Sequence, residues 1–131
     1  MVLNFYLRIW IMKQLNEHQE QALLIRWFRL QYPSLQLNLF AIPNGGARHI
    51  VTAVRLKEEG VIAGIPDLFL MFPKNQYHGL FIEMKAKTGK VSKAQKDFLA
   101  LANSLNYKAV VCYGFDDAKS IIEKYLHSKE L

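Results

Sequence analysis

Two short apolar segments that each carry an acidic side chain constrain this chain most strongly. Residues 64–70 place Asp67 directly ahead of an apolar run, and residues 80–85 place Glu83 among apolar neighbours. A carboxylate in a strand-like apolar run is costly to bury unless a hydrogen-bonding partner, an opposite charge or a metal ion compensates it. We therefore expect both carboxylates to belong to a functional site.

The spacing of the two segments predicts a β-hairpin. The intervening residues suffice for one strand, a turn at residues 74–76 and a return strand, which would bring the carboxylates together at one edge of a sheet. Lys85 follows Glu83 by two positions, so the period of a strand puts both on one face. Two carboxylates and one ammonium group on one sheet face are typical of metal-assisted phosphodiester hydrolysis.

Each of these residues also has a structural interpretation. Asp67 after a proline can begin a turn, Glu83 can form an ion pair with Lys85, and Lys85 can be a solvated charge at a strand end. We favour a metal site, because buried carboxylates are usually paired or bound to a cation. Oxygen ligands with no His or Cys nearby indicate Mg²⁺ or Mn²⁺, and the carbonyl of Met84 can add a further oxygen. Lys85 would then orient water or stabilise charge near the scissile phosphate.

Length and charge limit the remaining possibilities. A chain of 131 residues forms one domain, and a net charge of +6 with a pI near 9.5 favours a polyanionic partner. Cys112 is the only cysteine, which excludes an internal disulfide and suits a reducing, cytoplasmic compartment, as in a bacterial or phage-infected cell. Lysines follow Glu83 without an intervening acid, and we expect those beyond Lys85 to contact phosphates, the alternative being a solvated face. They are Lys87, Lys90, Lys93 and Lys96.

The order of elements predicts an α/β domain with a mixed sheet flanked by helices. Residues 1–15 form an apolar extension that is too short to span a membrane and lacks a cleavage site, and the domain covers residues 16–131. Asn16 and Gln19 predict a capping box at the start of a helix over residues 17–31. Ser92 is expected to cap a later helix, whose core face comprises residues 98, 101, 102 and 105. The other expected elements are strands at 37–42, 67–72, 80–85 and 108–113, a helix at 50–59 ending at Gly60, and a last helix from 116 or 117 to about 127.

Pro66-Asp67 followed by Glu83-x-Lys85 resembles the motif of the PD-(D/E)XK nuclease superfamily. The wider context resembles the virus-type replication-repair nuclease (VRR-NUC) domain over roughly residues 17–113, on segments 55–61, 64–68, 82–85 and 89–95. The resemblance implies a restriction-endonuclease-like fold and divalent-metal-dependent, structure-selective DNA cleavage in repair or replication. Small stand-alone members are similar to Holliday junction resolvases and tend to be homodimers, which implies branched DNA and a second copy as partners.

The resemblance also implies three further site residues. A metal-associated glutamate on the first helix, four residues before a glutamine, matches Glu17, although Glu20 falls near the same helix face. Gln95 matches a glutamine near the active site, its alternative being the partner of Ser92 in a capping box. Arg48 lies in a Gly-rich loop on the substrate side, where it would contact the DNA backbone or belong to a plain turn.

The sequence therefore predicts a Mg²⁺- or Mn²⁺-dependent DNA endonuclease. Its expected metal ligands are Asp67, Glu83 and Glu17, with Lys85 assisting the chemistry. The alternative is a nucleic-acid-binding module that keeps the fold without turnover. The intact Asp67, Glu83 and Lys85 favour the enzyme, because a degenerate site would be expected to lose at least one of them.

Overall fold

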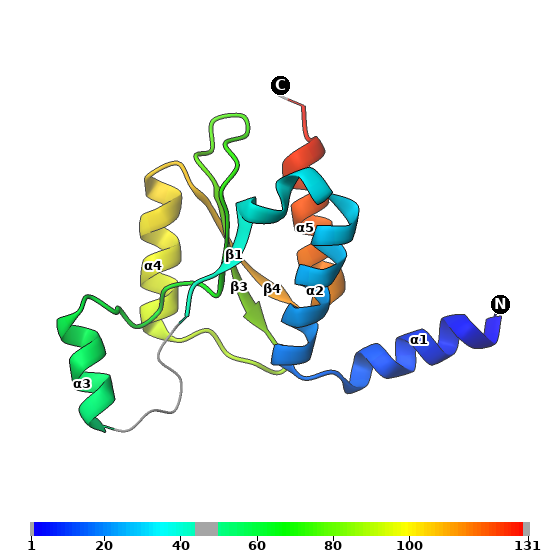
Figure 1. The fold of residues 1–131 in the computed structure, drawn as a ribbon, viewed down its shortest axis with the longest axis horizontal. Coiled ribbons are helices and arrows are strands. Elements are labelled where there is room, and N and C mark those ends of the chain that lie inside the picture. The colour runs from blue at the N-terminus through cyan, green and yellow to red at the C-terminus, as the bar shows by residue number, and fades with distance from the viewer. Residues whose placement is uncertain (1, 44–49, 130–131) are drawn as a thin grey trace.

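The computed structural model of the chain describes residues 2–43 and 50–129. They form a four-stranded mixed sheet flanked by helices, as predicted (Figure 1). The elements in chain order are α1 (Val2–Gln14), α2 (Glu17–Gln31), the 3-10 helix η1 (Pro33–Asn38), β1 (Leu39–Ala41), α3 (Ile50–Glu58), β2 (Leu68–Leu70), β3 (Leu80–Lys85), α4 (Lys93–Ser104), β4 (Lys108–Tyr113) and α5 (Phe115–His127).

The strands lie in the order β1-β2-β3-β4. β1 pairs with β2 and β2 with β3 in antiparallel fashion, so the predicted hairpin is present, with Leu68 opposite Ile82. β3 and β4 are parallel, with Glu83 opposite Val111, and α4 makes the connection between them. This parallel pair is the longest in the sheet and holds the middle of β3 rigidly.

The two faces of the sheet are covered differently. On β3, Leu80, Ile82 and Met84 point into the apolar core, and the alternate residues point to the face of α4. α2 and α5 lie on the core side and α4 on the other (Figure 1). Glu83 and Lys85 therefore share the α4 face, as the period of a strand requires.

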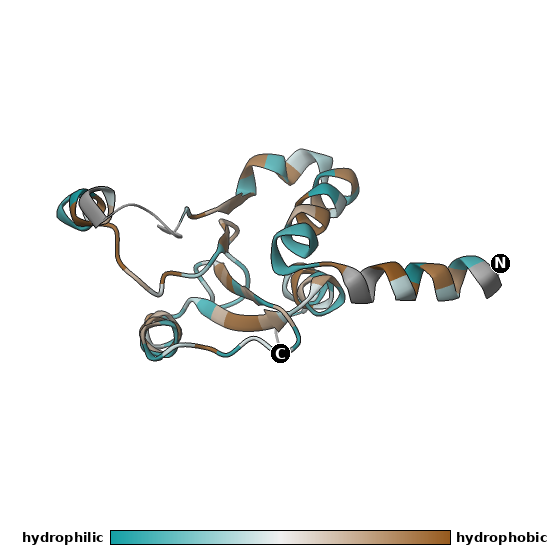
Figure 2. Ribbon diagram, turned by 90° about the horizontal axis from the view of Figure 1, so that it is seen from below, coloured by the Kyte–Doolittle hydropathy of each residue, from teal (hydrophilic) through white to brown (hydrophobic). Residues whose placement is uncertain are grey.

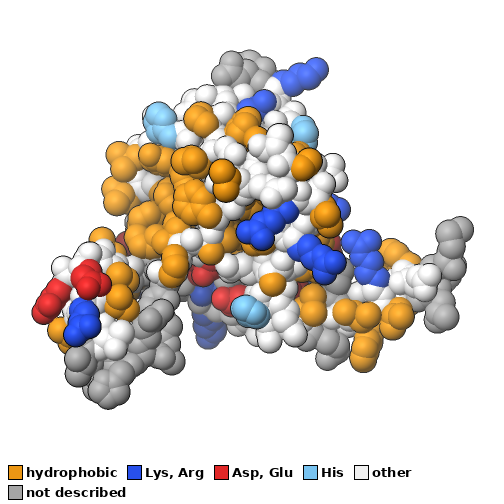
Figure 3. All heavy atoms as spheres, viewed as in Figure 1, with side chains coloured by type: hydrophobic (Ala, Val, Ile, Leu, Met, Phe, Trp, Pro, Cys, Tyr) orange, Lys and Arg blue, Asp and Glu red, His pale blue; other side chains and the backbone are white. Residues whose placement is uncertain are grey.

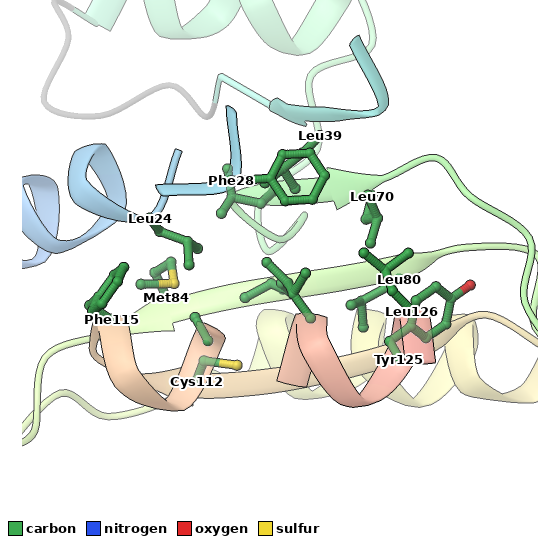
Figure 4. Packing of buried hydrophobic residues seen from close by; sticks show 14 residues of the cluster. Leu24, Phe28, Leu39, Leu70, Leu80, Met84, Cys112, Phe115, Tyr125 and Leu126 are labelled. Carbon is green, nitrogen blue, oxygen red and sulfur yellow. The ribbon is translucent and has the colours of Figure 1, made fainter. Parts of the chain in front are cut away.

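The core lies between the sheet and the pair α2 and α5 (Figure 4). Leu24 and Phe28 enter it from α2, at 0% and 1% exposure, because they are four residues apart on one helix face. Ala118 and Ile122 enter it from α5 with the same spacing and are fully buried. Cys112 is also fully buried, and its burial raises the pKa of the thiol to about 12, as apolar surroundings do for a cysteine.

Local capping chemistry sets the helix ends. The side chain of Asn16 accepts from the backbone N–H of Gln19 at 2.8 Å, while the side chain of Gln19 accepts from that of Asn16 at 3.0 Å. Ser92 and Gln95 form the same reciprocal pair at the start of α4. Both predicted capping boxes are confirmed. Gly60 ends α3 with a φ of 98°, as expected of a C-terminal glycine.

Three expectations from the sequence were wrong in detail. The strand at 37–42 is reduced to β1, because η1 occupies Pro33–Asn38. The strand at 67–72 is reduced to β2. At its start the side chain of Asp67 takes the backbone N–H of Met84, and at its end the N–H of Met71 donates to Asn38 of η1 and not to β1. Leu101 and Leu105 are each 55% exposed, so the core face of α4 is narrower than predicted.

The apolar extension forms α1, which projects away from the rest of the molecule (Figure 1). Within the described residues, no helix has the length and apolarity needed to cross a membrane.

Candidate active site

Asp67 is held at the start of β2 by contacts on both sides. Its carbonyl accepts from the backbone N–H of Ile42 at 2.8 Å, and its Oδ2 accepts from the backbone N–H of Met84 at 2.7 Å. The preceding loop runs close to α4, where a Cβ on Gly64 would lie 2.6 Å from the carbonyl carbon of Ala94. Gly64 also has a φ of 92°, so only glycine fits this approach. The loop thereby fixes Asp67 beside β3.

Glu83 is the one charged residue among the described residues that is classed as buried, with an exposed fraction of 3%. Its Oε1 accepts from Nε2 of Gln95 at 2.8 Å and lies 3.5 Å from Nζ of Lys85. Its Oε2 is buried and has no hydrogen-bond partner. Since a buried carboxylate oxygen without a partner is costly, this atom marks a position where a cation or a donor is expected.

The electrostatics of Glu83 agree with its geometry. Burial and, second, the negative charge of Asp67 raise the pKa of Glu83 to about 7, against the opposing effect of Lys85. The neighbouring ammonium group therefore does not fully compensate the two carboxylates. A divalent cation between them would supply the missing positive charge.

The carbonyl of Met84 faces the same edge as Asp67. Successive residues of a strand direct their backbone groups to alternate sides, and the carbonyl of Lys85 accepts from Gly114 on the β4 side at 3.1 Å. The N–H of Met84 already points to Asp67, so its carbonyl points there as well. Asp67, Glu83 and this carbonyl thus present oxygen atoms to one edge of the sheet.

A pocket of about 460 Å³ lies in front of these groups. Its wall brings together all five side chains that the sequence predicted as catalytic, from α2, the loop before β2, β3 and α4. They are Glu17, Asp67, Glu83, Lys85 and Gln95. Lys57 of α3 also lines the pocket, although the sequence did not mark it as a site residue. The only signal was its place in the segment that carried the family resemblance.

Glu17 and Glu20 have different surroundings. Glu17 lines the pocket, whereas Oε1 of Glu20 accepts from the backbone N–H of Phe115 at 3.4 Å. Gly114 precedes α5 and brings no capping side chain, so the carboxylate of Glu20 serves the N-terminus of that helix. Glu17 is therefore the acid of α2 that is available to the pocket.

The donor set fits a hard divalent cation. The oxygen atoms come from Asp67, Glu83 and the carbonyl of Met84. A cation would also provide a partner for Oε2 of Glu83, which has no hydrogen-bond partner. Among the described residues, no three His, Cys, Asp or Glu side chains lie close enough together to share one ion. Glu17 thus lines the same pocket without being a direct third ligand in this conformation.

The predicted basic contacts are only partly described. Arg48 lies outside the described residues. The four lysines beyond Lys85 are exposed in the loop after β3 and the first turns of α4, and one of them, Lys93, pairs with Asp97 at 2.8 Å. An exposed i,i+4 pair of this kind is weak, so Lys93 can exchange Asp97 for another anion.

Comparisons with known proteins agree with this geometry. The profile of the VRR-NUC domain matches residues 6–116. A solved structure described as a VRR_NUC domain protein is similar at 30% sequence identity and a TM-score of 0.76, covering 86% of this chain and 88% of that one. A search of curated proteins finds no match. The family model and the solved relative each cover most of the chain, so the chain belongs to the VRR-NUC domain family and has a nuclease-type fold.

Proposed function

We propose that this protein is a Mg²⁺- or Mn²⁺-dependent endonuclease that hydrolyses phosphodiester bonds in DNA. The observation that carries the proposal is the pair of Asp67 and Glu83, with the buried Oε2 of Glu83 left without a partner in front of a pocket. An ion pair with Lys85 alone does not account for the site, because the pKa of Glu83 is raised despite that pair. Membership of a family that acts on DNA supports the choice of substrate.

The chain's own residues have separable tasks in this proposal. Asp67, Glu83 and the carbonyl of Met84 would hold a cation, and Glu17 lines the same pocket. When bound, a divalent cation supplies Lewis-acid polarisation of the phosphate and lowers the pKa of water. Gln95 donates to Oε1 of Glu83 and so fixes the orientation of the carboxylate. The arrangement keeps the carboxylate in one orientation before substrate arrives.

Lys85 supplies positive charge on the substrate side. Its Nζ lies 3.5 Å from Glu83, and its side chain is 14% exposed, so it is held in place and partly shielded from water. A fixed ammonium group in such a place stabilises the charge that accumulates on the phosphate oxygens in the transition state. The exposed lysines that follow would extend the positive surface along the DNA backbone.

Selectivity for branched DNA and a homodimeric state belong to the same proposal. Both rest on the resemblance to stand-alone family members that are similar to Holliday junction resolvases. The alternative is a DNA-binding module without turnover. The pocket favours the enzyme, because a module that only binds phosphate has no use for a buried carboxylate, Glu83, beside the half-buried carboxylate of Asp67, since both repel phosphate.

The test is cleavage of linear, flap, splayed-arm and four-way-junction DNA with Mg²⁺, Mn²⁺ or EDTA. Asp67→Ala and Glu83→Ala are expected to abolish metal-dependent cleavage while DNA binding persists. Glu123→Ala removes a surface acid of α5 that does not line the pocket and is the matched control, which should cleave as the wild type does. Cleavage that survives in either pocket variant, after repurification to exclude contaminants, would remove the proposed site. Binding without cleavage by the wild type, on every substrate and metal, would select the silent module.

A further inference from the structure

A second groove adjoins the active-site pocket along the outer side of α2. The described residues that line it all belong to this helix, from Glu17 to Leu30, and the groove has a volume of about 730 Å³. α2 lies at the outside of the molecule (Figure 2), and basic side chains gather on the surface over it (Figure 3). The groove therefore offers a continuous surface along nearly the whole of one helix.

Three side chains that can bind an anion follow one side of this groove. At 100° per residue, His18, Arg26 and Arg29 fall within an arc of about 80° on α2. All three are exposed, and the other groove residues on this side, Ala22 and Ile25, carry no charge. Within the part of the chain that the structure describes, neither arginine forms an ion pair. Their guanidinium groups are therefore available to a ligand.

The groove and the active-site pocket share one side chain. Glu17 lines both of them, at the N-terminal end of α2. His18 follows directly, and Arg26 and Arg29 lie about two and three turns further along the helix. At 1.5 Å per residue, the row is roughly 16 Å long, which spans several phosphates of one DNA strand. A ligand bound along the row therefore leads into the pocket.

We propose that this face of α2 binds the sugar–phosphate backbone of the DNA substrate, on the side of the active site away from the lysines before and in the first turns of α4. The inference rests on the proposed nuclease function, which identifies the polyanion. α2 and α4 lie on opposite faces of the sheet, and in Figure 1 both begin at the lower side of the molecule. A strand whose scissile phosphate lies in the pocket would thus meet the lysines in one direction and the arginines in the other.

The chemistry of the row suits a phosphate backbone. An arginine guanidinium group can donate two parallel hydrogen bonds to one phosphate, and it stays charged throughout the physiological range. A ring N–H of His18 can donate to the phosphate nearest the pocket. Contacts of this kind fix the position of the DNA and read no base. The row would therefore set where the backbone enters the pocket and not which sequence is cut.

Binding of the full chain to splayed-arm and four-way-junction DNA in EDTA tests this proposal, measured by fluorescence anisotropy at several salt concentrations. Each phosphate contact contributes about 0.9 to the slope of log K against log salt on duplex DNA, so Arg26→Gln with Arg29→Gln should flatten the slope by up to about 2 units. Lys124→Gln with Lys129→Gln removes the same charge from exposed positions at and beyond the end of α5, and should leave the slope unchanged. Circular dichroism and thermal unfolding establish that each variant is folded.

Hydroxyl-radical footprinting on the same DNA locates the contact. The wild type should protect one continuous stretch of backbone. The double arginine variant should lose protection at one end of this stretch, and Lys87→Ala with Lys90→Ala should lose it at the other end. An unchanged salt slope in the arginine variant, or loss of protection at the same end in both variants, would overturn the proposal.

These results separate the α2 contact from the nuclease activity. In cleavage assays, the arginine variant should raise the DNA concentration for half-maximal cleavage more than it lowers the maximal rate, as expected of groups that bind substrate away from the reacting atoms. A wild type that binds DNA without cleaving it, with a flattened slope in the arginine variant, would end the nuclease proposal and support this contact. A wild type that cleaves DNA, with an unchanged slope in the arginine variant, would do the reverse.

Discussion

The metal-free protein should lose stability as the pH rises from about 4.5 to about 7. In this range the unfolded chain has released the proton of Glu83, whereas the folded protein still binds it. Burial and the charge of Asp67 raise the pKa of Glu83 from 4.5 to about 7. The folded state therefore binds this proton more tightly than the unfolded state does. The stabilisation is fully present below pH 4.5 and is lost as the pH rises through the folded pKa.

The size of this effect follows from the shift. One pKa unit corresponds to about 1.4 kcal/mol, so the shift of Glu83 amounts to about 3 kcal/mol. Lys85 already opposes the shift in this value, and the other charged side chains that line the pocket are Glu17, Lys57 and Asp67. A loss of this size is a large part of the stability of a small domain.

Urea unfolding of the wild type and Glu83→Gln in EDTA, at intervals from pH 4 to pH 8, measures the effect. The difference between the two free energies of unfolding should change by about 3 kcal/mol across this range and level off above pH 7. If the substitution by glutamine lowers the free energy of unfolding by the same amount at every pH, that amount does not affect how the difference changes with pH. Glu59→Gln, at an exposed position after α3, is the matched control and should give a flat difference.

Added Mg²⁺ extends the same experiment. A cation that binds the folded protein through the ionised Glu83 should stabilise the wild type at pH 8 and leave Glu83→Gln nearly unchanged. A difference between wild type and variant that stays flat from pH 4 to pH 8 would refute the reasoning, since Lys85 would then compensate the carboxylate fully.

Three further predictions concern the proposed nuclease. Lys85→Ala should lower turnover by at least about 10²-fold with metal affinity nearly unchanged, measured by single-turnover cleavage and calorimetry, and a collapse of metal binding would make Lys85 a structural counter-ion. Glu17→Gln should slow cleavage far more than Glu20→Gln, while Glu20→Gln should cost more thermal stability; the reverse ranking of cleavage rates would move the helix-borne acid to Glu20. Replacing Lys87 and Lys90 together by Ala should flatten the dependence of log K on log salt by up to about 2 units in fluorescence anisotropy, with junction preference retained, and an unchanged slope would make this run a solvated face.

The sequence predicted best those features that local chemistry determines. The helix over residues 17–31 begins and ends as expected, because Asn16 and Gln19 cap it and Pro33 follows. β3 and β4 also match residue for residue, and the two strands pair along their whole lengths. For the helix, the residues that set the boundary are sequence neighbours.

The sequence predicted less well those features that depend on distant segments. β2 ends sooner than its apolar run does, because strand length depends on which backbone groups a neighbour can pair. Leu101 and Leu105 belong to an apolar stripe of α4, yet the sheet beneath that helix covers only part of it. Lys57 reaches the pocket only through the path of the chain between α3 and β2, which no local pattern records.

The assignment of the two acids on α2 shows where pattern reasoning stops. Glu17 and Glu20 are three residues apart, so periodicity places them within about 60° of each other on the helix and gives them the same expected role. They differ because Gly114, nearly a hundred residues away, leaves the start of α5 without a capping side chain, and Glu20 accepts from Phe115 there. Gly114 has a φ of 89°, which favours glycine, and a Cβ there would lie 2.8 Å from Oε1 of Glu20, so a larger residue would displace that carboxylate. Glu20 is thereby committed to joining α2 to α5, and the acid one turn earlier is left to face the pocket.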